Sequence, residues 1–195
     1  LGQVVELSEL GRALFELVKN ADHRRLSWYR PDTVEKVERT EEQVVVTTLE
    51  GKRLNGKLLV IAEGGNSPTR EKIGLSLKQH HYGQVALIAN VETDKPHQNW
   101  AFERFTQSGP LAMLPLRQSL AEQGNGVCSL VWTLAQSQKD AMLGLSDAEF
   151  LSALQSEFGH RLGKLIRVGK RDVYPLVLTH AQDVISHRTV VIGNA

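Results

Sequence analysis

Residues 58–70 read Leu58-Leu59-Val60-Ile61-Ala62-Glu63-Gly64-Gly65-Asn66-Ser67-Pro68-Thr69-Arg70. The apolar run at its start predicts a strand covered on both faces, as in the parallel sheet of an α/β domain. Ser67 before Pro68 predicts the start of a helix, because serine caps free amides and proline tolerates the first helical position. A carboxylate, two glycines and a helix N-terminus therefore meet at the carboxyl end of a strand, where open α/β sheets bind ligands.

This junction allows two interpretations. A helix N-terminus can receive phosphate oxygens, and glycines let a ligand approach the backbone closely. An ordinary turn from strand to helix would show the same residues. The pattern alone leaves both open.

The segments upstream predict one helix and three strands. Leu7, Leu10, Leu14 and Leu17 form a single apolar stripe, which predicts a helix from about Ser8 to Asn20 with Ser8 as its cap. Strands are expected at residues 33–39, 43–49 and 54–62, with a hairpin turn at Glu50-Gly51.

The segments downstream have a different character. Glycine-rich and proline-containing breaks separate four strand-like runs, which predicts an antiparallel sheet at residues 85–91, 100–106, 111–116 and 127–134. Ser146 and Glu149 form a capping box that begins a second helix, and Gly159 is placed to end it. Two more strands are expected near residues 173–178 and 189–192.

Together these elements predict an α/β (α+β) chain with two lobes. Residues 1–75 would form part of a nucleotide-binding α/β lobe, residues 76–185 an antiparallel sheet lobe, and residues 186–195 a strand that returns to the first lobe. The chain has 195 residues, enough for a substantial core.

Composition excludes several classes of protein. Lys and Arg total 23 against 22 Asp and Glu, a net charge of +1, so no nucleic-acid partner is expected. A hydrophobic fraction of 41% indicates a globular chain, not a disordered one. The single cysteine, Cys128, rules out an internal disulfide framework and fits the cytoplasm.

No metal site is expected. The two adjacent histidines His80 and His81 would point to opposite sides of a strand. The remaining histidines show no ligand spacing: His23, His97, His160, His180 and His187.

Two segments resemble fingerprints of the flavoprotein aromatic hydroxylases of the para-hydroxybenzoate hydroxylase type. Glu63, Gly64, Ser67 and Arg70 match the second fingerprint, Asp-Gly-x-x-Ser-x-x-Arg, with Glu in place of Asp. Residues 190–195, Val-Val-Ile-Gly-Asn-Ala, resemble the opening of the third fingerprint, usually Gly-Asp-Ala.

The intervening sequence resembles the ubiquinone-biosynthesis branch of that family. The resemblance is carried by Ala101-Phe102-Glu103-Arg104-Phe105-Thr106, by Gly109-Pro110-Leu111-Ala112-Met113-Leu114-Pro115-Leu116, by Arg161-Leu162-Gly163-Lys164 and by Tyr174-Pro175-Leu176. Together with Val4-Val5-Glu6-Leu7 it extends through the whole chain.

The resemblance implies an FAD-dependent monooxygenase. NAD(P)H would reduce the flavin, O₂ would supply the oxygen atom, and a 2-polyprenyl-6-methoxyphenol would be hydroxylated. The cofactor-binding residues that it implies are Glu63, Gly64, Ser67, Arg70, Gly193 and Asn194; it carries over no catalytic residue. Arg70 would either complement a pyrophosphate or form a salt bridge within the corner of sheet and helix.

An apolar substrate pocket is also expected. Phe102, Phe105, Met113, Leu114 and Trp132, with Trp100, would line a cavity for a prenyl tail, or would simply form sheet core. The adjacent pair Glu103 and Arg104 would form a cross-strand ion pair or contribute to that pocket.

Partners are expected beyond the phenol itself. The basic residues between Arg161 and Arg171 would either contact an anionic membrane surface, which would place the protein at the inner membrane, or be solvated. An apolar face on the first helix and on the final strand is expected to be exposed and to favour self-association. A complex of ubiquinone biosynthesis is a further expected partner.

Some parts of the family pattern are absent from these residues. The family's Gly-x-Gly-x-x-Gly segment, which holds the FAD pyrophosphate, is not among them, so we expect the isolated chain neither to bind FAD tightly nor to hydroxylate a phenol. Two other functions remain open: a paralogous hydroxylase that acts at another ring position, and a non-catalytic module that binds a lipid-like phenol or a partner.

Overall fold

The computed structural model describes residues 3–21, 24, 26–116 and 125–194. Contacts divide the chain into two units. One contains residues 1–20 and 81–176, and the other contains residues 21–80 and 177–195. The mixed helix and sheet class expected from the sequence is confirmed, although the helix at residues 7–19 is counted with the sheet of the first unit.

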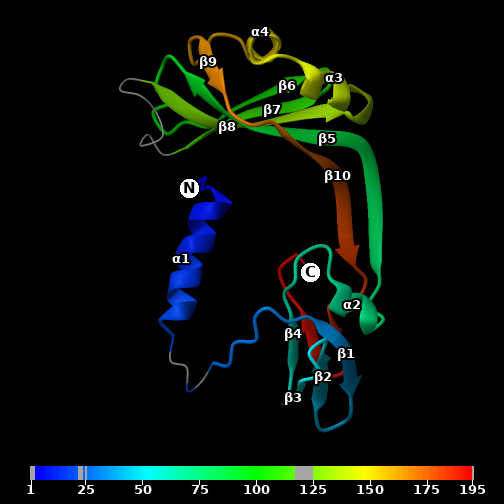
Figure 1. Cartoon of the computed structure of the whole chain (residues 1–195). Helices are drawn as coiled ribbons and strands as arrows, with labels where there is room; N and C mark the ends of the chain where they lie inside the picture. Colours follow the sequence, from blue (N-terminus) through cyan, green and yellow to red (C-terminus); the bar gives the residue numbers. More distant parts are fainter. Residues whose placement is uncertain (1–2, 22–23, 25, 117–124, 195) are drawn as a thin grey trace. The chain divides into compact units, whose positions relative to one another are not determined.

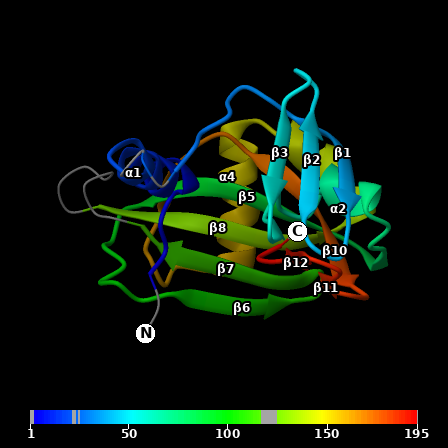
Figure 2. The same ribbon diagram turned by 90° about the horizontal axis from the view of Figure 1, so that it is seen from below.

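A large antiparallel sheet dominates the first unit. Its strand order is β10-β5-β8-β7-β6, and β9 also pairs with β5. Figure 2 shows β5, β8, β7 and β6 side by side. The strands span Leu77–Thr93 (β5), Phe102–Thr106 (β6), Gly109–Pro115 (β7), Gly126–Ala135 (β8), Leu165–Val168 (β9) and Asp172–Ala181 (β10).

One face of this sheet is covered by helix α4, Asp147–Phe158, as Figure 1 shows. The predicted capping box is confirmed, because Ser146 Oγ accepts from the amide of Glu149 and the carboxylate of Glu149 accepts from the amide of Ser146. The helix ends at Gly159 (φ +81°). Two shorter elements precede α4: the 3₁₀ helix η2, Gln136–Gln138, and α3, Lys139–Gly144.

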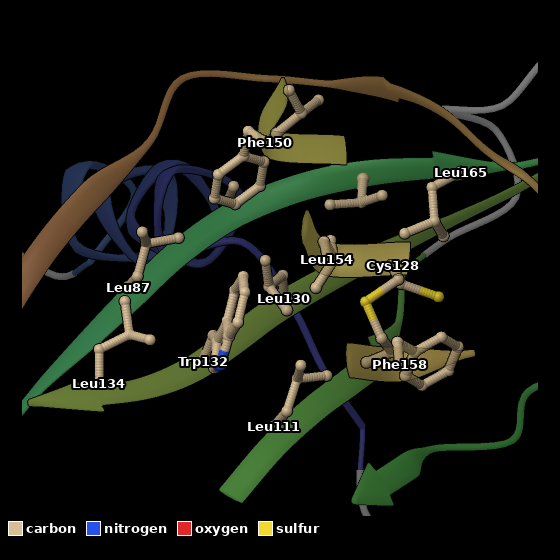
Figure 3. Packing of buried hydrophobic residues seen from close by; sticks show 14 of the residues in the cluster. Leu87, Leu111, Cys128, Leu130, Trp132, Leu134, Phe150, Leu154, Phe158 and Leu165 are labelled. Atoms are coloured by element: carbon tan, nitrogen blue, oxygen red, sulfur yellow. The ribbon is translucent and has the colours of Figure 1, made fainter. Parts of the chain in front are cut away.

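The main core lies between α4 and the sheet. Phe150 and Leu154 of α4 are fully buried, and the ring of Phe150 packs against Trp132 with a centroid separation of 6.1 Å. Figure 3 shows these side chains meeting Leu87, Leu111 and Leu130 from three neighbouring strands. Burial of this many large apolar groups supplies most of the stability of the unit.

The second unit contains two small sheets and one short helix. A meander has the order β1-β2-β3, and a mixed sheet has the order β11-β12-β4. Their bounds are Val34–Arg39 (β1), Val44–Thr48 (β2), Arg53–Gly56 (β3), Leu59–Ile61 (β4), Ile185–Ser186 (β11) and Thr189–Val191 (β12). Helix α2, Pro68–Lys72, follows β4, and Ser67 caps it as predicted.

The prediction of a single strand at residues 54–62 is wrong. The chain forms β3, which pairs antiparallel with β2, and then β4, which pairs parallel with β12. β3 and β4 belong to two different sheets, so the chain must turn between the two strands. Full burial of the apolar run is also wrong, since Val60 is 48% exposed.

Helix α1, Leu7–Lys19, confirms the predicted helix but not its cap. Glu6 occupies the N-cap position and no side chain caps the first turn, because the helix begins before Ser8. The leucine stripe is exposed, from 44% at Leu10 to 83% at Leu7. In the second unit, the β11-β12-β4 sheet also exposes one apolar face, with Leu58, Val60, Ile185 and Ile192. Self-association through such faces stays a prediction.

Gly163 makes a close approach that no other residue can make. Its φ is +71°, and a Cβ built on it would lie 1.6 Å from Asp94 Oδ1, the oxygen that accepts from the amide of Lys164. We expect Gly163→Ala to lower the free energy of unfolding by about 1–3 kcal/mol, because the left-handed backbone and the lost hydrogen bond act together. Denaturant titration measures this.

Gly144 provides the matched control. It ends α3, and nothing would lie within 4 Å of an added Cβ. Gly144→Ala should therefore leave stability unchanged or raise it slightly. Equal stability of the two variants would contradict the steric role of Gly163.

Candidate functional site

The structure brings the two fingerprint segments together. β4 and β12 are parallel neighbours with Ile61 opposite Val191, and the amide of Ile192 donates to the carbonyl of Ile61 at 2.9 Å. The loops that follow the two strands therefore leave the same edge of one sheet. Residues about 130 positions apart in the sequence become neighbours, which the sequence pattern alone does not establish.

Each of the two loops contains a glycine whose positive φ turns the chain away from its strand. Gly64 (φ +81°) and Gly193 (φ +71°) each leave their strand in the left-handed region. A Cβ on Gly65 would lie 3.3 Å from Asn194 Nδ2, so the two loops are in close contact. In the described part of the chain the backbone N–H groups of Gly64 and Gly65 donate no hydrogen bond, so they lack an internal acceptor.

Glu63 directs its carboxylate back into helix α2. Its Oε2 accepts from Ser67 Oγ (2.6 Å) and from the amide of Thr69 (3.1 Å), and its Oε1 accepts from Thr69 Oγ1 (2.6 Å). Ser67 Oγ in turn accepts from the amide of Arg70 at 3.2 Å. One carboxylate thus joins the loop after β4 to the first turn of the helix.

These bonds change the electrostatics of Glu63. Burial raises its pKa, but the hydrogen bonds from Ser67 and Thr69, together with the charge of Lys72, outweigh that effect and hold the pKa below its ordinary value. The first turn of α2 is therefore already occupied by an internal anion. The amides of Thr69 and Arg70 thus have internal acceptors, and the reception of a phosphate at this helix N-terminus stays a prediction.

Arg70 is the most unusual side chain at this junction. It is 1% exposed, and its Nε and Nη1 have no hydrogen-bond partner in the described residues. Its Nη2 lies 3.9 Å from Glu71 Oε1, a carboxylate that is largely exposed. The predicted salt bridge therefore exists only as a long contact. A buried cation with two unused donors normally has an anionic or carbonyl partner.

These residues fit an anionic, phosphate-containing cofactor such as FAD. The unused donors of Arg70 and the amides of Gly64 and Gly65 are the groups that phosphate oxygens accept from. Of the six residues expected to bind the cofactor, Gly64, Gly193 and Asn194 lie in the paired loops. Glu63 and Ser67 instead bind each other and α2, so they shape the site from within.

The expected substrate pocket is divided by the sheet. Strand register places Phe102 opposite Met113 and Met113 opposite Leu130, so these side chains point to the α4 side. Trp132 lies on that side too, and Met113 and Trp132 belong to the main core. Phe105 and Leu114 point to the other face, where Phe105 is 80% exposed. Trp100 precedes β6 and is exposed. One pocket lined by all these residues is therefore wrong.

The face opposite α4 offers a different set of apolar side chains. Alternation along β5, β7 and β8 puts Ile88, Ala112 and Val131 there, beside Leu114 and Phe105. The first three were not among the predicted pocket residues, because their side chains are small or branched and the face they occupy depends on strand parity. Period-2 alternation was the signal that identifies them.

Several charged residues have structural roles. Arg104 Nη1 donates to the carbonyl of Phe158 at the end of α4, and within the described ranges neither Glu103 nor Arg104 forms the expected cross-strand ion pair. Three of the five basic residues between positions 161 and 171 are paired with carboxylates: Arg167 with Glu92, Lys170 with Asp172 and Arg171 with Asp147.

The remaining candidates carry little chemistry. Burial raises the pKa of the Cys128 thiol to about 12, which makes it inert. No cluster of metal-ligating side chains occurs among the residues that the structure describes, and His23 and Ala195 lie outside them. None of the described helices combines the length and hydropathy of a membrane-spanning segment.

Comparison with known proteins finds related hydroxylases. No family model matches the chain. The ubiquinone hydroxylase UbiL of Rhodospirillum rubrum is 33% identical over 165 residues, which are 85% of this chain and 37% of that protein. The ubiquinone hydroxylase UbiM of Neisseria meningitidis is 26% identical across the whole chain and 40% of its own length. The chain thus spans less than half the length of these relatives.

Solved structures show the same fold. The flavin-dependent halogenase CmlS superposes with a TM-score of 0.73 at 15% identity, over 97% of this chain and 35% of its own. The p-nitrophenol 4-monooxygenase PnpA of Pseudomonas putida gives 0.59 at 18% identity, over 84% and 40%. At these identities the likeness establishes the fold, and it confirms the fold class expected from the sequence.

Proposed function

We propose that this chain, a homologue of the ubiquinone hydroxylases, forms part of a flavin-dependent aromatic monooxygenase of ubiquinone biosynthesis. The observation that carries the proposal is the meeting of the loops after β4 and β12 at one sheet edge, together with a buried arginine with unused donors in the helix that follows the first loop. The names of the relatives support ubiquinone hydroxylation, and the fold neighbour CmlS, a flavin-dependent halogenase, supports flavin use. The fingerprint resemblance supports FAD and NAD(P)H.

The residues of the chain would divide the work of holding the cofactor. Arg70 would donate to phosphate oxygens, and the amides of Gly64 and Gly65 would approach the same groups. Glu63 would keep α2 and Arg70 in place through Ser67 and Thr69. Bound FAD would supply the oxygen-transfer chemistry, in which an aromatic C–H, O₂, NAD(P)H and a proton give a phenolic C–OH, water and NAD(P)⁺.

The substrate would be a 2-polyprenyl-6-methoxyphenol. The apolar sheet face with Ile88, Ala112 and Val131 supports an aromatic or prenyl ligand, since it offers small and branched side chains on a surface that α4 does not cover. A paralogous hydroxylation at another ring position would use the same groups, because regiochemistry depends on how the ring is oriented.

An isotope experiment tests the function. The protein expressed from its own gene is incubated with FAD, NAD(P)H, ¹⁸O₂ and a short-chain 2-polyprenyl-6-methoxyphenol, and the product is analysed by mass spectrometry. The proposal predicts one ¹⁸O atom in a new ring hydroxyl. NAD(P)H oxidation that yields only hydrogen peroxide, or phenol binding without turnover, would contradict it; the second result would favour a non-catalytic binding module.

A further inference from the structure

The turn between β11 and β12 holds an arginine in a backbone conformation that favours glycine. Arg188 has φ +53°, in the left-handed region where a side chain is disfavoured. A residue that is kept there against its backbone preference normally has a side chain with contacts that offset the strain.

The side chain of Arg188 makes such contacts. Its Nε and Nη2 both donate to the carbonyl of Glu41, in the turn between β1 and β2. Its Nη1 donates at 3.1 Å to the carbonyl of Lys57, in the link between β3 and β4. The neighbouring His187 Nε2 donates to the carbonyl of Thr40 at 2.7 Å. The planar guanidinium thus joins three segments of the second unit through backbone carbonyls.

The backbone of Arg188 also begins the pairing of the two parallel strands. Its carbonyl accepts from the amide of Leu59 at 2.9 Å, immediately before Thr189 pairs with Leu59. At the other end, the amide of Ile192 donates to the carbonyl of Ile61. Only three residue pairs lie between, so the contacts at the start of the strands strongly influence their register.

We infer that Arg188 is a positioning residue that fixes the register of β12 against β4, and through it the meeting of the loops at Gly65 and Asn194. A slip by one residue would turn the side chains of β12 to the opposite face and move Asn194 away from Gly65. The link to a cofactor rests on the proposed function, whereas the link to register does not.

The variant Arg188→Gly shows whether the side chain of Arg188 fixes the strand register or makes its contacts without such a role. Glycine relieves the left-handed strain and removes the guanidinium at once, so an incidental arginine would give an unchanged or stabilised protein. We expect instead that hydrogen exchange of the Leu59 and Ile192 amides speeds up by about tenfold or more. The amide of Val46 in β2 should change less. Unchanged or slower exchange at Leu59 and Ile192, or an equal rise at all three amides, would overturn the inference.

Two further variants keep the test informative. Gln98 has φ +51° and is exposed, so Gln98→Gly is a matched control that should leave exchange of these amides unchanged. If Arg188→Gly does not fold, Arg188→Lys takes its place, because lysine keeps the charge but cannot span the carbonyls of Glu41 and Lys57 together. Its exchange should rise at the same two amides, and unchanged exchange would again overturn the inference.

FAD affinity distinguishes this inference from the proposed function. If the paired loops hold the cofactor, the dissociation constant for FAD should rise in the variants that loosen the Leu59 and Ile192 amides. Faster exchange with unchanged FAD affinity would support the role of Arg188 in register and overturn the assignment of the loops to the flavin.

Discussion

Arg70→Met is expected to raise the dissociation constant for FAD by about 10- to 100-fold, while the stability of the flavin-free chain stays unchanged or increases. The weaker FAD binding and the unchanged or higher stability both follow from the unused donors of Arg70. A buried guanidinium with two unused donors destabilises the empty site, and charge-assisted hydrogen bonds to phosphate are worth about 1.5–3 kcal/mol in the filled one.

Fluorescence titration of FAD and denaturant unfolding of the flavin-free chain measure the two effects. Arg12→Met is the matched control, because Arg12 is exposed on α1 and forms only a surface pair with Glu9. It should change neither quantity by much. A large loss of stability with unchanged FAD affinity would mean that Arg70 has a structural partner and does not bind the cofactor.

Glu63→Gln is expected to lower the free energy of unfolding by about 1–3 kcal/mol. The carboxylate accepts three hydrogen bonds from Ser67 and Thr69, and the amide that replaces it offers one acceptor oxygen and introduces a donor facing these donors. Glu63→Asp should lose less stability, because it keeps the charge with a shorter reach. Glu35→Gln, at an exposed position of β1, is the control.

The effect of Glu63 should also depend on pH. Its pKa is lower in the folded chain than its ordinary value near 4.5, so the folded state favours the carboxylate. The stabilisation is therefore fully present above pH 4.5 and is lost as the pH falls through the folded-state pKa. The difference in unfolding free energy between the wild type and Glu63→Gln should shrink in that acid range. A difference that is constant from pH 7 to pH 3 would contradict the role of the charge.

Local signals explain which elements the sequence predicts well. The capping box at Ser146 and Glu149 and the Ser67-Pro68 helix start are set by groups a few residues apart, and the structure contains both. The antiparallel sheet follows from β-branched runs and glycine breaks. These features depend on short-range chemistry, which is visible in the sequence.

The sequence predictions are wrong where the local structure depends on contacts with segments that are distant in the sequence. The division of residues 54–62 into two strands depends on β2, which pairs with β3 in one sheet, and on β12, which pairs with β4 in another. The divided pocket depends on which face α4 covers. The use of Glu63 as an acceptor for Ser67 and Thr69, and not as a free ligand, depends on the exact course of the loop. None of these is encoded in local periodicity.

The residues proposed to bind the cofactor were predictable only as a motif. The fingerprints indicated Gly64 and Arg70 after one strand and Gly193 and Asn194 after another, and the parallel pairing of β4 with β12 explains why the two loops lie next to each other. No sequence motif indicated a role for Arg188. Its role becomes visible only through its contacts with Glu41 and Lys57.

A titration of the ¹⁵N-labelled chain with FAD shows whether the loops after β4 and β12 bind the cofactor, since amide shifts report weak binding as well as tight binding. We expect the largest shifts at Gly64, Gly65, Gly193 and Asn194, and we expect Arg70→Met to reduce them. Shifts that centre on other residues, or no shift at these four amides at millimolar FAD, would show that the paired loops do not form the cofactor site.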